Sequence, residues 1–293
     1  MSQAINSPFR YAGGKFYARK LILEHVPDHT CYIEPFVGGG SIFFAKDKVE
    51  TNILNDADPD LINTYLIIRD RVDELVAALD GEQALKERHT WYKNEFKPSN
   101  ELERAVRWYY LNRTSYSGIM NQKNCYWGYG DKYSMRPENW GRSLLKTSAK
   151  LQEVEFTNLD FEDVINNAPD GAFLFVDPPY FNADQDKFYT FSFKKEDHYR
   201  LEQCLLRNKE RLSFLITYDN SPEIRELYSW ANAMLDKEWN YTISRTDDQT
   251  KNQSQAPEKA SRYKGKEVFI TNYPVQESVA AENLELTFDE VWK

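Results

Sequence analysis

The chain has few of the residues that build disulfide frameworks or metal centres. Its 293 residues include three cysteines, Cys31, Cys125 and Cys204, which stand far apart, and only four histidines. Cysteines at this spacing form neither a zinc-type pair nor a disulfide framework. We therefore expect a reduced protein with no metal site.

Long apolar stretches are also missing. No run of eighteen apolar residues occurs, and the first residues, MSQAINSPFRYAGGK, lack the apolar core of a secretory signal. The sequence therefore predicts no membrane segment and a cytoplasmic location.

Positive charge is scarce overall but locally abundant. The formal net charge is −9, which by itself argues against a nucleic-acid partner. Residues 104–150, however, hold nine Lys/Arg against two acids, whereas residues 276–293 hold five acids and one lysine. The chain thus combines an acidic body with a basic central segment, which suits either a nucleic-acid surface or a solvated charged face.

Strand-like and helix-like stretches alternate along most of the chain. This alternation predicts an α/β fold with a mainly parallel sheet and helices on both faces. The expected strands are 31–36, 52–58, 154–161, 172–180, 213–220 and 266–273, and the expected helices are 41–48, 61–79, 101–116 and 198–212.

Three segments depart from this alternation. Residues 117–140 are rich in Gly, Asn and aromatics without a clear period, and residues 181–195 and 245–265 are predicted loops. We expect a sheet domain formed by residues 1–60 and 150–275, interrupted by a helical basic insert at 61–149. An acidic tail at 276–293 follows.

An apolar strand that ends in two prolines is the most informative motif. Phe173–Val176 is followed directly by Asp177, Pro178, Pro179 and Tyr180. Proline has no N–H, so this turn offers mainly acceptors, which suit the two N–H groups of an adenine amine. Tyr180 supplies a ring on which a base could stack. The same residues also suit a strand end with no function.

A glycine-rich turn follows the first expected strand. Its residues are Glu34-Pro35-Phe36-Val37-Gly38-Gly39-Gly40-Ser41, and Asp56 stands at the end of the next strand. Glycines let a ligand approach the backbone, and an acid at this position suits a cofactor ribose. A plain tight turn explains the glycines equally well. The turn lacks the Gly-Lys-Ser/Thr ending of a phosphate-binding loop, which disfavours an ATPase.

A third motif, Phe9-Arg10-Tyr11-Ala12-Gly13-Gly14-Lys15, lies near the N-terminus. An aromatic residue, two glycines and a lysine could wrap a small ligand that has a carboxylate and an adenine ring. A turn with a solvated lysine is the alternative.

Taken together, the three motifs resemble the Dam-type DNA adenine methyltransferases of the D12 class, with the alpha motif order. The resemblance runs from Phe9 to about Tyr273 and includes LNRTSYSG (111–118), which is similar to an LNRxxYxG segment of that family. It implies a Rossmann-like S-adenosylmethionine-dependent methyltransferase sheet with a mainly helical DNA-recognition insert. It also implies methyl transfer to the N6 amine of adenine in double-stranded DNA by base flipping, in a bacterial or phage-encoded enzyme.

The resemblance assigns roles to individual residues. The implied catalytic residues are Asp177, Pro178, Pro179 and Tyr180. The implied cofactor site comprises Tyr11, Lys15, Glu34, Phe36, Gly38, Gly39, Gly40, Asp56, Asp160, Phe161 and Asp177. Asp160 also suits a helix N-cap, which leaves its role open.

The insert is expected to contact DNA. Basic and amide side chains suit phosphates and base edges, respectively. The expected contacts are Arg113, Tyr116, Asn121, Gln122, Lys123, Asn124 and Arg136. GATC-specific members of the family have a pattern like NxxGxFNVPFG after the YxG segment. Residues 119–140 lack it, so we expect a site other than GATC or a relaxed version of it.

Other functions remain as alternatives. A methyltransferase acting on RNA or on protein glutamine would more often have Asn at position 177. A nucleotide-dependent oxidoreductase would give the Asp-Pro-Pro-Tyr motif no role, and a DNA-binding protein with a dead cofactor site would not need Lys15, Asp56 and Asp177 intact. The sequence leaves open both possibilities, an enzyme that acts alone and one accompanied by a restriction endonuclease in a restriction-modification system.

Overall fold

The computed structural model describes residues 4–11, 13–130, 134–182, 190–191, 193–240 and 264–275. The acidic tail expected at 276–293 and most of the loops expected at 181–195 and 245–265 lie outside these residues.

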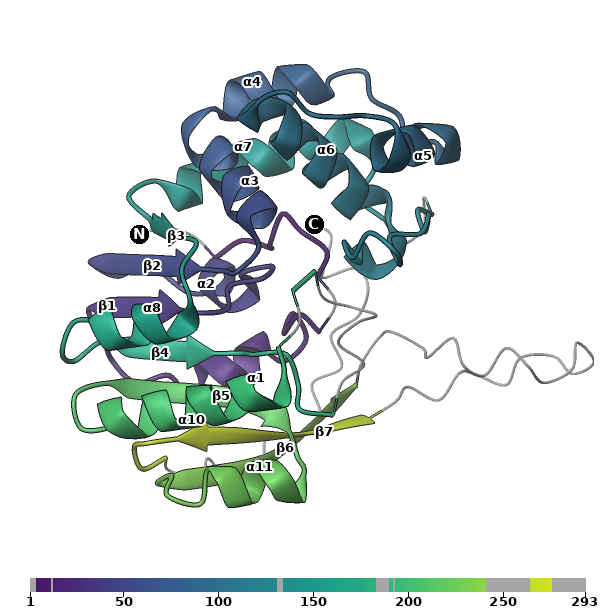
Figure 1. Ribbon diagram of the computed structural model, residues 1–293. Coiled ribbons are helices and arrows are strands. Elements are labelled where there is room, and N and C mark those ends of the chain that lie inside the picture. Colours follow the sequence, from purple (N-terminus) through teal and green to yellow (C-terminus); the bar gives the residue numbers. More distant parts are fainter. Residues whose placement is uncertain are drawn as a thin grey trace, which may run out of the picture.

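A mixed sheet forms the base of the molecule (Figure 1). Its strands are β1 (Cys31–Glu34), β2 (Thr51–Asn55), β3 (Glu155–Thr157), β4 (Phe173–Val176), β5 (Ser213–Asp219), β6 (Ala233–Asn240) and β7 (Lys264–Thr271). Their spatial order is β3-β2-β1-β4-β5-β7-β6, and in this described sheet β7 alone runs in the direction opposite to the other strands. The expected α/β class with a Rossmann-like sheet is confirmed.

Helices cover both faces of the sheet and form a group above it (Figure 1). They are α1 (Arg19–Leu23), α2 (Ser41–Ala45), α3 (Pro59–Asp70), α4 (Val72–Leu79), α5 (Lys86–Asn94), α6 (Glu101–Thr114), α7 (Trp140–Leu151), α8 (Phe161–Asn167), α10 (Lys195–Asn208) and α11 (Pro222–Leu227). Helices α3 to α7 make up the group above the sheet, and two single 3₁₀ turns, η1 (Tyr116–Gly118) and η2 (Pro137–Asn139), precede α7.

Side chains of β4 alternate between two apolar cores, as a strand requires. Phe173 and Phe175 join a cluster shared with α2, α3, α4, α6 and α7, whereas Leu174 and Val176 join a cluster shared with α8, α10 and α11. The helices of the 59–151 region therefore pack into the same core as one face of the sheet.

The expectation of one helix over 61–79 was wrong. The helix breaks at Arg71 (φ −139°, ψ 37°), and α4 then packs against α6 and α7. Helix α3 begins where Asp58 accepts hydrogen bonds from the backbone N–H groups of Asp60 and Leu61, with Pro59 at the first turn. Helices α1, α5, α7, α8 and α11 and strand β6 were not predicted from the sequence.

Candidate active site

Parallel strands β1 and β4 lie side by side, although more than a hundred residues separate them in sequence. Strand β1 also pairs with β2 on its other side, so the strand order changes direction between β1 and β4. Crevices at the carboxyl ends of strands beside such a switch point are where open α/β sheets bind ligands. The Asp-Pro-Pro-Tyr motif and the glycine turn follow these two strands.

A cavity of about 80 Å³ lies at this edge. Of the residues implicated by sequence, it is lined by Tyr11, Lys15, Glu34, Phe36, Gly38, Gly39, Gly40, Asp177, Pro178 and Tyr180. The remaining lining residues, to which the sequence had assigned no individual role, are Gly13, Gly14, Val37, Ser41, Ile42 and Phe175. The structure thus brings the three motifs to one cavity.

The Tyr11 ring lies across the glycine turn. A Cβ at Gly38 would stand 2.8 Å from this ring, and a Cβ at Gly39 would stand 3.0 Å from the Tyr11 side chain. Gly38 (φ +46°) and Gly40 (φ +65°) adopt the left-handed conformation that favours glycine. The turn therefore has a bare backbone surface that a flat group covers.

Asp56 supports the glycine turn from the end of β2 but does not line the cavity. Its carboxylate accepts from Gly38 N at 2.9 Å and from Asp58 N at 3.0 Å. Burial raises its pKa to about 6, while these backbone donors act in the opposite direction. Asp56 thus lies behind the turn and holds its backbone.

Asp177 is held by two donors from distant elements. The Lys15 Nζ lies 2.7 Å from Oδ1 and 3.0 Å from Oδ2 of Asp177, and the Thr217 hydroxyl donates to Oδ1 at 2.6 Å. The Lys15 Nζ also lies 4.8 Å from the centre of the Tyr180 ring. The buried ammonium therefore occupies an acceptor position of the Asp177 carboxylate.

Two buried carboxyl groups lie near this pair. Glu34 accepts from the Tyr32 hydroxyl at 2.7 Å and from Phe43 N at 2.9 Å, and burial raises its pKa to about 8. Glu267, on β7, is 1% exposed. Neither of its carboxylate oxygens accepts a hydrogen bond from a described residue.

Burial raises the pKa of Glu267 to about 8. The nearby Lys15 charge and the Tyr180 hydroxyl act in the opposite direction and lower this pKa. Sequence reasoning missed Glu267 and Thr217. Thr217 offered one signal, a polar residue within the apolar run of β5, whereas Glu267 follows Lys264 and Lys266 and offered none.

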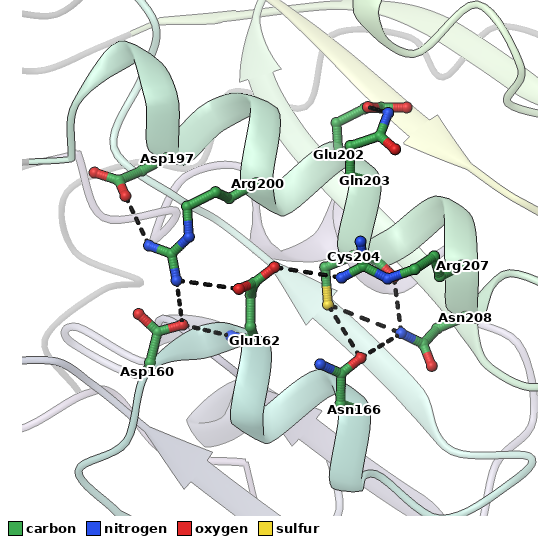
Figure 2. A network of polar contacts seen from close by, with 10 residues as sticks. All are labelled: Asp160, Glu162, Asn166, Asp197, Arg200, Glu202, Gln203, Cys204, Arg207 and Asn208. Carbon is green, nitrogen blue, oxygen red and sulfur yellow. Dashed lines mark hydrogen bonds and ion pairs between the residues drawn. The ribbon is translucent and has the colours of Figure 1, made fainter.

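Asp160 and Phe161 begin α8 and lie outside the cavity lining. Asp160 accepts from Glu162 N at 2.9 Å, so it caps the helix, and Figure 2 shows its carboxylate turned toward Arg200, at 2.9 Å. The centre of the Phe161 ring lies 5.5 Å from the centre of the ring of Phe36, which lines the cavity. Phe161 thus contacts a cavity residue without lining the cavity itself. Pro179 also lies outside the lining.

The candidate DNA-contacting residues divide into buried and exposed groups. Arg113 is only 3% exposed and donates to the backbone oxygen of Pro8 at 3.2 Å, so the expectation that it meets a phosphate does not hold for this structure. Tyr116, Gln122, Lys123 and Arg136 are exposed, and Asn121 and Asn124 are half-buried.

A short turn displays several of these side chains. Tyr116 N donates to Tyr126 O at 2.8 Å, and Asn124 N donates to Asn121 O at 2.9 Å. The Asn121 side chain itself accepts from Lys123 N. The Tyr126 ring, which sequence reasoning did not select, is 62% exposed beside these residues.

Several cations of the central segment are bonded to groups of the protein itself. Arg104 pairs with Asp60, Arg107 donates to the backbone oxygens of Tyr92 and Lys93, and the Lys150 ammonium donates to Lys46 O. These cations bind the protein itself, so the charge count of the segment overstates its basic surface.

Among the described residues no cluster of three His, Cys, Asp or Glu is placed to hold a metal ion. None of the described helices is long and apolar enough to cross a membrane.

Comparisons with known proteins agree in pointing to one kind of enzyme. The family model described as "D12 class N6 adenine-specific DNA methyltransferase" matches residues 11–243. The chain is 32% identical to the DNA N-6-adenine-methyltransferase of Escherichia phage P1 over 76% of its own length, although this match covers 31% of the phage protein. It is 30% identical to the DNA adenine methylase of Escherichia coli K12, over 76% of this chain and 84% of that protein. It is 26% identical to Type II methyltransferase M1.LlaDCHI of Lactococcus lactis, over 91% and 95% of the two chains.

Proposed function

The chain belongs to the D12 class N6 adenine-specific DNA methyltransferases, and from this premise we propose how its cavity serves the reaction. The cavity binds S-adenosylmethionine against the glycine turn and an adenine, turned out of the DNA helix, against Asp177–Tyr180. The observation on which this proposal rests is that the glycine turn and Asp177 line one cavity at the β1–β4 edge.

The residues around the glycine turn fit this cofactor. The bare backbone of Gly38–Gly40 permits close approach of a flat ligand, as the Tyr11 ring demonstrates by lying across it. Asp56 holds the turn from behind by accepting from Gly38 N, and the Phe36 ring in the cavity lining offers an apolar surface for an adenine. When bound, the cofactor supplies an electrophilic methyl group.

The Tyr11 ring lies across the bare backbone of the glycine turn, so it must shift before a flat ligand can cover that surface. Tyr11 then serves as a cover over the bound cofactor, and Lys15 lies close enough to meet its carboxylate.

Asp177 orients the substrate amine. A carboxylate oxygen that accepts an N6 hydrogen draws the nitrogen lone pair out of conjugation with the ring. Thr217 keeps Oδ1 fixed, while the ammonium of Lys15 must leave Oδ2 before an amine can take its place. Pro178 and Pro179 add no N–H that would compete as donors, and the Tyr180 ring stacks on the extrahelical base.

Residues 61–149 form the target-recognition insert in this proposal. The exposed side chains around η1 and the following turn, namely Tyr116, Gln122, Lys123 and Tyr126, meet DNA, with Asn121, Asn124 and Arg136 beside them. Aromatic rings there can stack on bases and Lys123 can meet a phosphate. Such a substrate places the enzyme in the cytoplasm of a bacterium or of a phage-infected cell.

Transfer of a labelled methyl group tests the proposal. Purified protein and labelled S-adenosylmethionine are incubated with unmethylated double-stranded DNA, RNA or protein, and the DNA is digested to nucleosides. We expect label in N6-methyladenine only. Label in RNA or protein would reject the substrate, and activity in the Asp177→Asn variant equal to that of an Asp170→Asn control, which alters an exposed carboxylate before β4, would reject the site.

A further inference from the structure

One side chain of helix α6 holds the backbone of the N-terminal segment. Asn112 is fully buried; its Oδ1 accepts from Arg10 N at 3.0 Å and its Nδ2 donates to Arg10 O at 2.7 Å. Both backbone polar groups of Arg10 are thus satisfied by one amide that lies 102 positions later in the sequence. A paired contact of this kind fixes position and orientation together.

Neighbouring residues of the 112–118 segment hold the same stretch of backbone. The contacts between residues 8–10 and residues 112–118 are here called the joint. Arg113 donates to Pro8 O at 3.2 Å, and the Arg10 guanidinium donates to Ser115 O at 3.3 Å. Gly118 (φ +70°) approaches so closely that a Cβ there would stand 2.2 Å from Arg10 O. No larger residue fits at Gly118 without displacing Arg10.

The segment held by this joint, here called the N-terminal strap (residues 8–11 and 13–15), leads directly into the cavity. Tyr11 follows Arg10 and covers the glycine turn. Gly14 N donates to Tyr11 O at 3.1 Å, which forms the turn that brings Lys15 to Asp177. Any shift of Arg10 therefore moves the two side chains that border the cofactor and the substrate amine.

The other side of the joint continues into the exposed turn. Gly128 N donates to Thr114 O at 3.0 Å, and Tyr116 N donates to Tyr126 O. The segment that displays the exposed aromatics and Lys123 is therefore bonded to the residues that hold the strap.

We propose that Asn112 is a positioning residue that couples the DNA-facing turn to the cofactor cavity by fixing the strap. This inference rests on the proposed function of both sites. If DNA shifts the 112–128 segment, the strap moves with it, so DNA binding alters cofactor affinity, and by thermodynamic reciprocity the cofactor alters DNA affinity by the same factor.

Proteolysis tests the joint without any ligand. Trypsin cleaves after Arg10, and this bond is held by the joint. Asn112→Ala should increase the rate of cleavage there about tenfold or more, because both Arg10 backbone groups lose their partner. The matched control is Asn63→Ala, which removes a similar buried bond to Glu101 O away from the strap. Equal cleavage rates in both variants would overturn the role of Asn112.

Calorimetric titration with S-adenosylhomocysteine, with and without unmethylated plasmid DNA, tests the coupling. In the wild-type protein, DNA should change the affinity about fivefold or more, and in Asn112→Ala the two affinities should become equal. Gly118→Ala, which displaces the strap rather than releasing it, should also remove the difference.

A wild-type affinity that does not respond to DNA would overturn the coupling. If the wild-type protein fails to bind S-adenosylhomocysteine, the proposed function fails as well, and the tryptic comparison still decides the joint.

Discussion

Removing the Asp177 carboxylate should impair folding and catalysis for separable reasons. The Lys15 side chain is 3% exposed and that of Asp177 is 19% exposed. Breaking a buried ion pair by removing one partner costs about 3–5 kcal/mol, because the other charge stays buried. Since Asp177 borders the cavity, we take the lower end, about 3 kcal/mol, for Asp177→Ala. In a protein of this size that corresponds to a fall in Tm of roughly 5–10 °C.

Asp177→Asn should separate the two effects. Its amide oxygen still meets Lys15, so the loss of stability should be smaller than in Asp177→Ala. Its N–H groups, however, face the donors of the substrate amine, so methyl transfer should fall by about a hundredfold or more. DNA affinity, measured by fluorescence anisotropy, should change little, because the exposed turn is unaltered.

A second substitution identifies the source of the instability. Lys15→Met removes the buried cation, so the double variant Lys15→Met/Asp177→Asn should melt near the wild-type temperature and still fail to transfer methyl groups. Calorimetric melting and labelled-methyl assays on the four proteins of this cycle measure both quantities. A double variant that melts no higher than Asp177→Asn would refute the role of the Lys15 charge, and wild-type turnover in Asp177→Ala would refute the site.

Four further outcomes are expected. Asp56→Ala should weaken cofactor binding in calorimetric titration more than it weakens DNA binding. Equal losses would contradict the assignment of Asp56 to the cofactor site. Glu267 has a folded-state pKa of about 8 against an ordinary 4.5, so it binds its proton more tightly in the folded protein. Wild-type stability should therefore decrease as pH rises from about 5 to 8 relative to Glu267→Gln, and parallel pH profiles of Tm would exclude this. Replacing Lys123 and Arg136 with Ala should reduce the slope of log binding constant against log salt concentration for DNA, by about one for each phosphate that the protein no longer neutralises. The control Lys209→Ala, at the C-terminal end of α10, should leave this slope unchanged. Mapping methylated adenines in DNA from a methylation-free host should reveal a short site other than strict GATC, and modification confined to GATC would show that the missing pattern has no bearing on specificity.

Local patterns determined the sheet and the cavity residues. The runs that became β1, β4 and β5 are apolar and short, and the motifs that follow β1 and β4 stand where parallel strands end. Because the carboxyl ends of parallel strands meet at one edge, the glycine turn and Asp177 could be placed together without coordinates.

Helix boundaries and burial were harder to predict. The apolar spacing of 61–79 is that of one helix, yet the chain turns at Arg71 because α4 packs against α6 and α7. Helix α7 has buried residues at Trp140, Leu144 and Leu151, a helical spacing that was masked by the irregular segment before it. Tertiary contacts decided where both helices begin, since neither the stretch around Arg71 nor the stretch before Trp140 contains a strong helix start or stop signal.

By itself, the sequence determined the α/β class, the three motifs and most of the residues that line the cavity, because each depends on order along one strand or one turn. Only the tertiary structure decided which charges face solvent: Arg113 and Lys150 are buried, whereas Lys123 is exposed. It alone also joined Asn112 to Arg10 and placed Thr217 and Glu267 near Asp177. Exposure and long-range pairing depend on which surfaces meet when the chain packs, and that information is spread over elements far apart in sequence.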